Sequence, residues 1–588
     1  MLKIVNTLED AMELKRWISE RDKSFTALDT ETTGVDFFDP NFRVRIIQFG
    51  SDKEAWIVPV EQWLGLVKDI CENYSGRWLI HNARFDIGAL ATHGIKIPWY
   101  RVDDTMIAMR LAEPIKPAGL KQAATRHVSR SASGSQSDLH KAMKTNKWDW
   151  DTVPIDFPPY VYYAAMDVIL TSRLYLTQIC QRGLHSPVYE LEMDVRHVCS
   201  TMENKGMRVD MDFSRKTGET LREEAEKLQA EIASKYGFAL MSTSDLSRWL
   251  LGQGAPLTKL TNGGKPSVDK EALDDLAQLH DLPPMVKEVV EKAVRCRKVL
   301  KMASSYFDNF VELADSNALL HPSIETVAAR TGRMSIRTPA LQTLPRISDD
   351  PDSKLVRNAV IPRADGEVLV SSDYEQIELR IVASLSEDPG LIEAFKVADE
   401  TGLDFFTQSA RQVYNDDTIQ KSDGRRPTIK SLYYAASYGA GVKKMALTAG
   451  VPVEEMQDVK DRVFSRYPGM GKFMKDSEKM CRENDGWVTT QMGRALYVDP
   501  DMAYKAANAR IQGTAADVLK LAVVNMANAG LDEFMVVPVH DEVVLSVPQD
   551  ELENAREVCR NSMADYSMSV PLLAEPSDGY MTWGSVPK

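Results

Sequence analysis

A short acidic segment interrupts an apolar run near the end of this chain and limits the folds open to it. The run VVPVHDEVVLSVP spans residues 536–548, and His540, Asp541 and Glu542 lie at its centre. The apolar and β-branched residues on both sides predict two buried strands joined by a turn. Two adjacent carboxylates at the tip of an apolar hairpin are costly to bury unless a cation neutralises them. The segment therefore predicts either an ordinary polar turn or one half of a metal site.

A second segment favours the metal site. Residues 367–380, EVLVSSDYEQIELR, read as a strand followed by a helix, with Asp373 at the junction. Asp373 and Asp541 are far apart in the sequence, but each closes an apolar strand, so the two can meet across one sheet. Paired in this way they would hold two Mg²⁺ ions for phosphoryl transfer.

A basic helix is predicted between these two strands. The segment RRPTIKSLYYAASYG spans residues 425–439, and Pro427 is placed where it can open a helix. Arg426, Lys430, Tyr434 and Tyr438 recur every four residues, so they share one helical face. Two cations followed by aromatic rings suit a nucleoside triphosphate, with phosphates on the charges and the base or sugar against the rings. A solvated basic face is the alternative for a helix taken alone.

The three segments together resemble DNA polymerase family A, which includes the bacterial repair polymerase large fragment and several phage replicases. The resemblance implies that Asp373 and Asp541 bind metal and align the primer 3′-hydroxyl with the α-phosphate. Glu542 would be an auxiliary carboxylate beside them. Arg426 and Lys430 would grip the incoming triphosphate, and Lys430 would also protonate the leaving group.

The same resemblance implies how substrates are selected. Glu378 matches the residue that blocks a 2′-hydroxyl, so deoxynucleotides are expected. Tyr438 would stack near the templating position, while Gln376 and His540 would line the nucleotide and the primer terminus. Tyr434 occupies a position where family members carry Phe or Tyr, and its hydroxyl can replace the missing 3′-OH of a dideoxynucleotide. Weak discrimination against dideoxy terminators is therefore predicted.

Two further segments match the family. TGRMSIRTPALQTLP (331–345) places Arg333 and Gln342 as readers of the minor groove, where donors test pair geometry more than sequence. Asn508 and Gln512, around IQGTAADVLKLAVVNM (511–526), are expected to be further DNA contacts. One departure is Phe406, which stands where the family often has a histidine.

The first third of the chain carries a second set of carboxylates. SFTALDTETTG (24–34) ends a predicted strand with Asp29 and Glu31 two residues apart, hence on one side of the sheet. HNARFD (81–86) supplies Asp86, and YYAAMD (162–167) supplies Tyr163 and Asp167 on one face of a predicted helix. Four converging carboxylates would repel one another without cations and would bind a pair of divalent metals.

These three segments resemble the DEDD family of 3′→5′ exonucleases, in the subtype where a tyrosine orients the attacking water. The resemblance implies metal ligands at Asp29, Glu31, Asp86 and Asp167, with Tyr163 as the catalytic tyrosine. Two Mg²⁺ ions are expected in each of the two active sites, and Mn²⁺ is expected to substitute for them.

Composition sets compatible limits. The chain has 588 residues, and its net charge of −14 argues superficially against a nucleic-acid partner. Net charge is a weak guide, because carboxylates assigned to metal sites add to it and binding depends on local fields. Residues 286–303, VKEVVEKAVRCRKVLKMA, carry six basic residues against two acidic. They resemble the family's thumb helix, whose cations contact phosphates without reading sequence.

The remaining sequence features favour a cytoplasmic protein, in the host cell if a phage encodes it. Its 6 cysteines include no C-x-x-C pair, so neither a zinc site nor a disulfide framework is indicated. The N-terminus lacks the apolar core of a signal peptide. No apolar run approaches the roughly 18 residues of a membrane span, so no membrane partner is expected.

The fold class predicted is α/β and α+β multidomain, with an RNase H-like exonuclease domain and a right-hand polymerase of palm, fingers and thumb. The expected limits are 1–185 for the exonuclease domain, 186–320 for the thumb, 321–385 and 501–588 for the two parts of the palm, and 386–500 for the fingers. A Ser-rich stretch at 129–137 is predicted to be a loop. The chain begins directly at the exonuclease, which favours a phage-type arrangement.

The sequence thus predicts a replicative, proofreading DNA polymerase of a phage genome. Its expected partners are primer–template DNA, single-stranded 3′ ends and dNTPs. A helicase or primase and a single-strand-binding protein are further candidates, and the chain is expected to be a monomer. Three alternatives remain: a nuclease whose polymerase half only binds DNA, a non-enzymatic nucleic-acid clamp, and an RNA polymerase of related architecture, which Glu378 disfavours.

Overall fold

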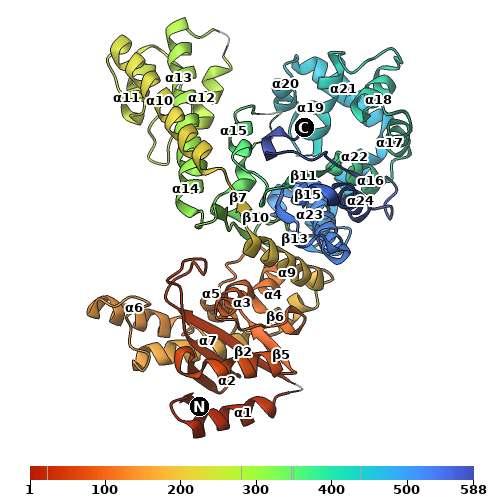
Figure 1. Cartoon of the computed structure of the whole chain (residues 1–588). Coiled ribbons are helices and arrows are strands. Elements are labelled where there is room, and N and C mark those ends of the chain that lie inside the picture. The colour runs from red at the N-terminus through yellow and green to blue at the C-terminus, as the bar shows by residue number, and fades with distance from the viewer. Residues whose placement is uncertain (23, 280, 346, 348–349, 438, 588) are drawn as a thin grey trace.

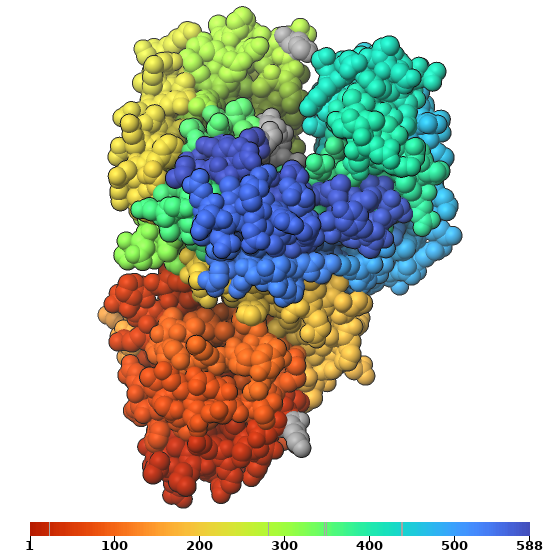
Figure 2. All heavy atoms as spheres, turned by 45° about the vertical axis from the view of Figure 1, so that its right-hand side comes forward, coloured from red at the N-terminus to blue at the C-terminus, as the bar shows by residue number. Residues whose placement is uncertain are grey.

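The computed structural model describes residues 1–22, 24–279, 281–345, 347, 350–437 and 439–587. The N-terminal third forms one mass, drawn in red and orange in Figure 1, and the rest forms a second mass with two helical arms. Figure 2 shows the C-terminal segment, in blue, between these arms. The described residues include no helix that is both long and apolar enough to cross a membrane. All six cysteines are free and buried.

The N-terminal mass is built on a six-stranded mixed sheet. β2 and β3 pair antiparallel, as do β3 and β4, whereas β1 lies parallel to β4 and β5 lies parallel to both β2 and β6. In sheet order the strands are β1 (Leu2–Ile4), β4 (Ala55–Pro59), β3 (Val44–Gly50), β2 (Phe25–Thr32), β5 (Arg77–Ile80) and β6 (Val102–Asp104).

Helix α7 (Pro158–Tyr175) packs across β2, β3 and β4, and its sequence explains why. Pro158 and Pro159 open the helix, and the apolar residues that follow lie on more than one face, which suits a helix buried against a sheet. The contact is so close that a Cβ on Gly50 would lie 2.5 Å from a methyl carbon of Val168. This packing carries Asp167 of α7 to the strand that bears Asp29 and Glu31.

The other N-terminal helices surround this sheet. The Ser-rich stretch 129–137 is only partly the loop that was predicted, because Gly134–Ser137 already belong to α6. The helices are α1 (Leu8–Ser19), α2 (Val60–Asn73), α3 (Ala83–Thr92), a 3₁₀ helix (Trp99–Arg101), α4 (Thr105–Ala112), α5 (Leu120–His127), α6 (Gly134–Asn146) and α8 (Gln178–Leu184).

Helix α9 (Tyr189–Lys205) joins the two masses through buried charges. Near its start, Glu192 accepts hydrogen bonds from Arg494 and, at 2.5 Å, from Lys520. Near its end, Glu203 accepts hydrogen bonds from Arg84 of α3 and from Arg196. Buried ion pairs are stable only when each charge is compensated, so these contacts hold α9 in one position between the masses.

One helical arm follows α9. Its long helices α10 (Met211–Tyr236) and α13 (Pro284–Met302) pack together. The rest of the arm consists of α11 (Thr243–Gly252), α12 (Lys270–Ala277), a π-helical turn (Ala303–Asp308) and α14 (Asn309–Leu313).

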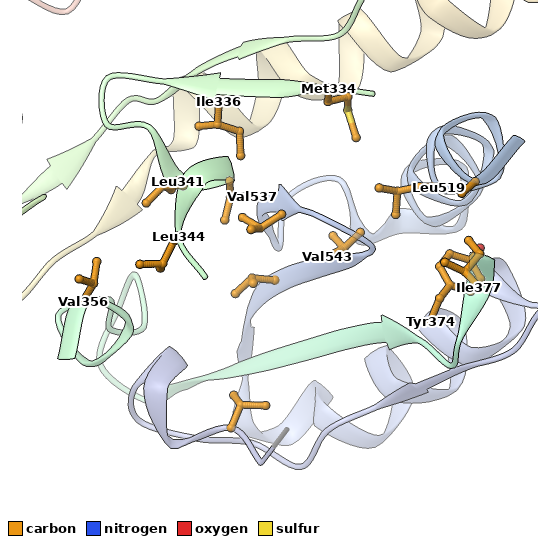
Figure 3. Packing of buried hydrophobic residues seen from close by; sticks show 14 of the residues in the cluster. Met334, Ile336, Leu341, Leu344, Val356, Tyr374, Ile377, Leu519, Val537 and Val543 are labelled. Carbon is orange, nitrogen blue, oxygen red and sulfur yellow. The ribbon is translucent and has the colours of Figure 1, made fainter. Parts of the chain in front are cut away.

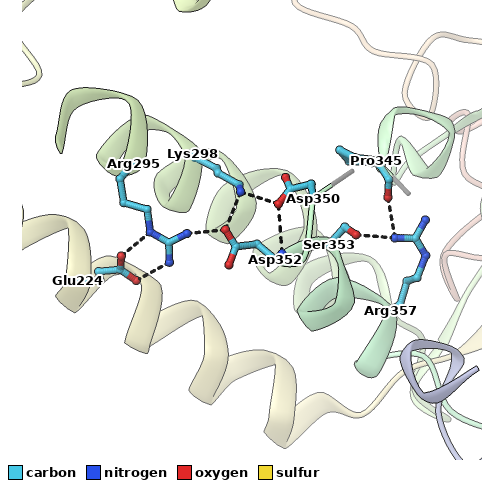
Figure 4. Close-up of polar contacts among 8 residues, drawn as sticks. All are labelled: Glu224, Arg295, Lys298, Pro345, Asp350, Asp352, Ser353 and Arg357. Atoms are coloured by element: carbon cyan, nitrogen blue, oxygen red, sulfur yellow. Dashed lines mark hydrogen bonds and ion pairs between the residues drawn. The ribbon is translucent and has the colours of Figure 1, made fainter. Parts of the chain in front are cut away.

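Two of the α13 cations that the sequence assigns to DNA phosphates, Arg295 and Lys298, form ion pairs within the protein. Arg295 pairs with both carboxylate oxygens of Glu224, at 2.6 and 3.0 Å, and with Asp352, as Figure 4 shows. Lys298 lies 2.6 Å from the carboxylates of both Asp350 and Asp352. DNA phosphates would therefore compete with these acidic residues for the same cations.

A four-stranded antiparallel sheet lies at the centre of the second mass. In order it contains β14 (Met535–Val539), β15 (Glu542–Pro548), β11 (Glu367–Tyr374) and β16 (Ala574–Pro576). Val537 and Val543 of this sheet belong to one buried apolar cluster with Ile336, Leu341 and Leu344, which Figure 3 shows. The predicted strands that carry Asp373 and Asp541 are thus neighbours.

Helices and short hairpins complete the second mass. The hairpins pair β9 (Ser323–Glu325) with β10 (Ser335–Arg337), and β12 (Trp487–Thr489) with β13 (Ala495–Tyr497). β7 (Met207–Arg208) and β8 (Leu319–Leu320), which lie on either side of the helical arm in the sequence, also pair antiparallel. The helices are α15 (Ser353–Asn358), α16 (Ile377–Ser386), α17 (Pro389–Thr401), α18 (Phe405–Tyr414), α19 (Arg425–Ser437), α20 (Val442–Ala449), α21 (Val453–Arg466), α22 (Pro468–Glu483), α23 (Ala506–Met526) and α24 (Leu552–Met563). Short 3₁₀ or π-helical turns lie at Leu341–Thr343, Pro500–Lys505, Ala527–Leu531, Gln549–Glu551 and Trp583–Ser585.

Two candidate active sites

The first site lies where β11 ends beside the turn between β14 and β15. Asp373 pairs in register with Glu542, and the Tyr374 N–H donates to the Asp541 carbonyl oxygen at 3.3 Å. His540 has a φ of 58°, the left-handed conformation that a tight turn requires. The two predicted metal ligands therefore lie at the same end of the neighbouring strands β11 and β15.

Gln342 holds this turn in place. Its amide nitrogen donates to the Pro538 carbonyl at 3.2 Å, and its amide oxygen accepts the His540 N–H at 3.1 Å. The His540 Nε2 atom lies 3.0 Å from the Leu344 carbonyl oxygen. Gln342, predicted to contact DNA, thus also shapes the segment that carries Asp541.

A cavity of about 460 Å³ opens beside the turn. Several elements contribute to its wall, including α16, α19, α23 and the segment around Arg333. Its lining residues include Arg333, Gln342, Gln376, Glu378, Lys430, Tyr434, His540 and Asp541, all predicted site residues, together with Met334, Tyr374, Ile377, Ala515, Ala516 and Leu519.

Glu378 and Arg333 form an ion pair on one wall of this cavity. The Arg333 guanidinium lies 2.5 Å from the Glu378 carboxylate, whose side chain is only 14% exposed. Arg333 follows Gly332, which has a φ of 81°, and a Cβ on Gly332 would lie 2.8 Å from the Arg494 side chain, so a larger residue there would be strained. The Lys520 ammonium donates to the Gly332 carbonyl at 2.7 Å. The buried charges around α9 therefore position the segment that carries Arg333.

The cationic face of α19 has partners that the sequence analysis did not identify. Arg426 donates to Asp404 at 3.0 Å, and its guanidinium lies 5.6 Å from the Phe406 ring centre. The Lys430 ammonium lies 5.9 Å from the same ring, which is also 5.9 Å from the Tyr434 ring. Phe406 therefore packs against the face of α19 that carries the two cations and the tyrosine. Tyr438, the last residue predicted on this face, lies outside the described residues.

Glu542 is held on the buried side of the sheet. One carboxylate oxygen accepts from the Ser371 hydroxyl at 2.9 Å and the other from the Trp583 indole N–H at 3.1 Å. The Arg357 guanidinium lies 4.8 Å from the centre of the Trp583 ring. Among the described residues, the cavity is lined by Asp541 and not by Glu542.

Asn508 and Gln512 lie one turn apart on α23 and are half-buried. Ala515, Ala516 and Leu519, which line the cavity, follow Gln512 at helical spacings of three, four and seven residues. The two predicted DNA contacts therefore continue the cavity wall along the same helix face.

The second site lies on the N-terminal sheet. Carboxylate oxygens of Asp29, Glu31 and Asp167 all lie within 4.8 Å of one another. Asp86, from α3, is buried nearby and accepts a hydrogen bond from Thr30 at 2.7 Å. The four residues predicted as metal ligands are thus gathered around β2.

The electrostatics of this cluster fit divalent cations. Burial raises the pKa of Asp29 to about 7 and raises that of Glu31 well above its ordinary value, with the Asp29 charge adding to the effect on Glu31. Burial and the Asp29 charge also raise the pKa of Asp86. Carboxylates that resist ionisation when buried together become stable anions beside metal ions. The residues present therefore fit the metal pair that the sequence implies.

Lys121 is the residue of this site that the sequence analysis missed. Its ammonium forms an ion pair with Asp167 and lies 4.8 Å from the Tyr163 ring centre. A hollow of about 700 Å³ beside it is also lined by Gln122, Thr125, Arg126, Tyr163 and Asp167, among others. Lys121 lies in GLKQAATRH, where no spacing or neighbouring motif distinguishes it from other surface lysines.

Comparisons with known proteins identify the class of this chain. Residues 211–585 match the family model "DNA polymerase family A", and residues 5–178 match the model "3'-5' exonuclease". The chain is thus a DNA polymerase with a 3′–5′ exonuclease domain. It belongs to DNA polymerase family A. The matches confirm the predicted multidomain fold class and the predicted function of a DNA polymerase with a 3′–5′ exonuclease.

Relatives agree with this assignment. The chain is 31% identical to the DNA polymerase of Mycobacterium phage L5, over 99% of this chain and 96% of the relative. It is 30% identical to the DNA polymerase of Mycobacterium phage D29, over 95% of this chain and 93% of the relative. Among solved structures, the POL domain of Pol1 from M. smegmatis, in complex with DNA primer-template and dNTP, matches with a TM-score of 0.81. That match has 23% identity and covers 99% of this chain and 100% of that one, so it shows the fold.

Proposed function

We propose that this chain extends DNA primers at the cavity beside Asp541 and removes 3′-terminal nucleotides at the cluster around Asp29. The observation that carries the first half is the cavity itself. It places a carboxylate, the Glu378–Arg333 pair and Lys430 of the α19 cationic face around a space of about 460 Å³. Carboxylates and cations that line one cavity suit a metal-bound triphosphate.

In the polymerase site, Asp373 and Asp541 would hold two Mg²⁺ ions, or Mn²⁺ in their place. Bound there, the ions would lower the pKa of the primer 3′-hydroxyl and offset the charge of the phosphates. Arg426 and Lys430 would bind the triphosphate, with Lys430 protonating the pyrophosphate that leaves as the 3′-oxygen bonds to the α-phosphorus. Glu542, whose carboxylate accepts hydrogen bonds from Ser371 and Trp583, would add negative charge on the buried side of the metal ligands Asp373 and Asp541.

The other cavity residues would orient the substrates. Gln376 and His540 would line the nucleotide and the primer terminus, and Tyr438 would stack near the templating base. Arg333, Gln342, Asn508 and Gln512 would contact the primer–template in its minor groove. The continuity of the α23 face with the cavity supports this path for the duplex.

In the exonuclease site, Asp29, Glu31, Asp86 and Asp167 would hold the second pair of ions. Tyr163 lies one turn before Asp167 on α7, and its ring also lines the hollow, so it would orient the attacking water. The water oxygen bonds to phosphorus as the bond to the 3′-oxygen breaks, and the water's protons are shared between the two products. A nucleoside 5′-monophosphate and a shortened 3′-hydroxyl end result.

The domain limits and partners remain part of this proposal. The limits are 1–185 for the exonuclease, 186–320 for the thumb, 321–385 and 501–588 for the palm, and 386–500 for the fingers. The substrates would be primer–template DNA, single-stranded 3′ ends and dNTPs. The likeness to phage polymerases supports replication of a phage genome in the host cytoplasm. We further propose that the chain acts as a monomer beside a helicase or primase and a single-strand-binding protein.

The test is a primer-extension assay with a 5′-labelled primer on a longer template. With Mg²⁺ and four dNTPs, the primer should grow to the end of the template; without dNTPs it should shorten from its 3′ end. A chelator should stop both reactions. Shortening without any extension would instead support a nuclease whose polymerase half only binds DNA.

Glu378→Ala should raise ribonucleotide incorporation. The nearly buried Glu378 side chain narrows the cavity where a 2′-hydroxyl would lie, and its loss opens that space. We expect the ratio of rNTP to dNTP incorporation efficiency to rise by about 10²-fold, which corresponds to relief of a steric clash of ~3 kcal/mol. Glu375→Ala, an exposed neighbour, should leave the ratio unchanged. An unaltered ratio in the Glu378 variant would mean that another residue excludes ribonucleotides.

Tyr434→Phe should increase discrimination against dideoxynucleotides. The Tyr434 ring lines the cavity beside Phe406, and removing only its hydroxyl removes the group that would replace a missing 3′-OH. A hydrogen bond to a charged group contributes roughly 1.5–3 kcal/mol, so discrimination should rise about tenfold to hundredfold. Tyr433→Phe, which removes a buried hydroxyl 2.9 Å from Ser409, is the matched control. Equal terminator use by both variants would contradict the assignment.

A further inference from the structure

Lys121 stands at the start of α5, and this helix packs along α7. Its ammonium reaches Asp167 and lies beside the ring of Tyr163, one turn earlier on the same face of α7. One cation thus touches both residues that α7 contributes to the exonuclease site.

Burial shows that this contact is more than a surface ion pair. The side chains of Lys121 and Asp167 are 11% and 10% exposed. An ammonium withdrawn this far from water is costly unless carboxylates compensate it. Asp29 and Glu31 are close enough to act on its charge as well. Lys121 is therefore held inside the carboxylate cluster by the cluster itself.

Charge balance gives the lysine a second role during hydrolysis. The four carboxylates carry four negative charges, which two divalent ions neutralise. The phosphodiester brings one more negative charge, and attack by hydroxide adds another in the transition state. With metal ions bound at Asp167, the Lys121 ammonium would be free to face this excess charge, whereas Arg126, the other cation in the lining of the adjoining hollow, pairs with Glu113.

The hollow beside Lys121 supports this role. Gln122, Thr125 and Arg126 of α5 line it together with Tyr163 and Asp167. A hollow lined by Lys121 and Asp167 fits the last nucleotide of a single strand, whose phosphate would then lie within reach of the ammonium.

We propose that Lys121 is a further catalytic residue of the exonuclease site, which neutralises Asp167 before metal binding and then binds the scissile phosphate. The proposal rests on the proposed exonuclease function. The Lys121 ammonium would thus compete with metal for Asp167 in the free enzyme and would stabilise the reacting phosphate once metal and DNA are bound.

The test compares Lys121→Met, Lys121→Arg and the control Lys116→Met, which removes an exposed lysine just before α5. In single-turnover degradation of single-stranded DNA, Lys121→Met should lose about 10²-fold in rate, whereas Lys121→Arg should stay within about tenfold of wild type. Lys116→Met should match wild type. Primer extension, measured on the same preparations, should be unchanged in all three and shows that each variant is folded.

A second readout needs no activity. Mg²⁺ is titrated without DNA while the thermal unfolding of the exonuclease domain is followed. Lys121→Met should respond to severalfold lower Mg²⁺ concentrations than wild type, because the competing cation is gone. A degradation rate within twofold of wild type, or a higher Mg²⁺ requirement, would overturn the proposal. If wild type itself does not shorten DNA, the proposed exonuclease function fails, and the titration still decides whether Lys121 competes with metal.

Discussion

Asp541→Ala should abolish primer extension and leave 3′ shortening intact. The substitution removes one of the two carboxylates at the end of the central sheet, and with it the site's hold on metal. Because metal ions stabilise the charge of phosphoryl transfer by several kcal/mol, the extension rate should fall by at least about 10³-fold. Asp541 is only half-buried in its turn, so the fold should tolerate the change. The measurement is single-nucleotide incorporation on a labelled primer with saturating dNTP and Mg²⁺.

Asp550→Ala provides the matched control for this experiment. Asp550 is an exposed carboxylate just beyond the other end of β15, so the same substitution there removes equal charge without touching the cavity. It should extend primers at the wild-type rate. Extension by Asp541→Ala within tenfold of wild type would mean that the polymerase site lies elsewhere, and loss of both reactions would indicate a folding defect.

Much of the fold could be predicted because the relevant signals are local. Apolar runs predicted the strands β11, β14 and β15, and a four-residue repeat predicted the cationic face of α19. The same signals placed Asp373 and Asp541 at strand ends, which become neighbours once the strands pair. Their roles as metal ligands stay predictions, and the structure places their backbone segments side by side.

Contacts between distant segments could not be predicted in the same way. Arg494, Lys520 and Glu192 come from a hairpin and two helices, and each taken alone reads as a surface charge. The Lys121–Asp167 pair and the Phe406 contacts on α19 likewise depend on how helices pack, which no local pattern encodes. The same limit explains why the ion pairs of Arg295 and Lys298 on α13 with Glu224, Asp350 and Asp352 could not be predicted, while the DNA contacts of this helix stay a prediction.

These distant contacts shape the polymerase site. Lys520 binds Gly332, Gly332 precedes Arg333, and Arg333 pairs with Glu378 in the cavity wall. Glu192 of α9 accepts hydrogen bonds from both Lys520 and Arg494 and so fixes the position of Lys520. The position of the residue predicted to exclude ribonucleotides thus depends on buried charges outside the cavity.

The double variant Asp29→Ala/Glu31→Ala should lose 3′ shortening and keep primer extension, the reverse of Asp541→Ala. It removes two of the three carboxylates that lie within 4.8 Å of one another, so shortening of single-stranded DNA should fall by at least about 10³-fold while extension continues. Asp103→Ala is the matched control, because this buried carboxylate of the same sheet pairs with Arg77 and not with the cluster. Shortening by the double variant at the wild-type rate would place the nuclease elsewhere.

The double variant should also change how the stability of the protein depends on pH when a chelator has removed metal ions. Burial raises the folded-state pKa of Asp29 to about 7, above the unfolded value near 4, so the native state binds more protons between these pH values. Wild-type stability without metal should therefore fall as the pH rises from about 4 to 7, and the variant should lose this part of the dependence. At pH 8 in chelator it should unfold at a temperature equal to or above that of wild type. A lower unfolding temperature at pH 8 would mean that the carboxylates stabilise the fold without metal, contrary to the cost of ionising them in a buried position.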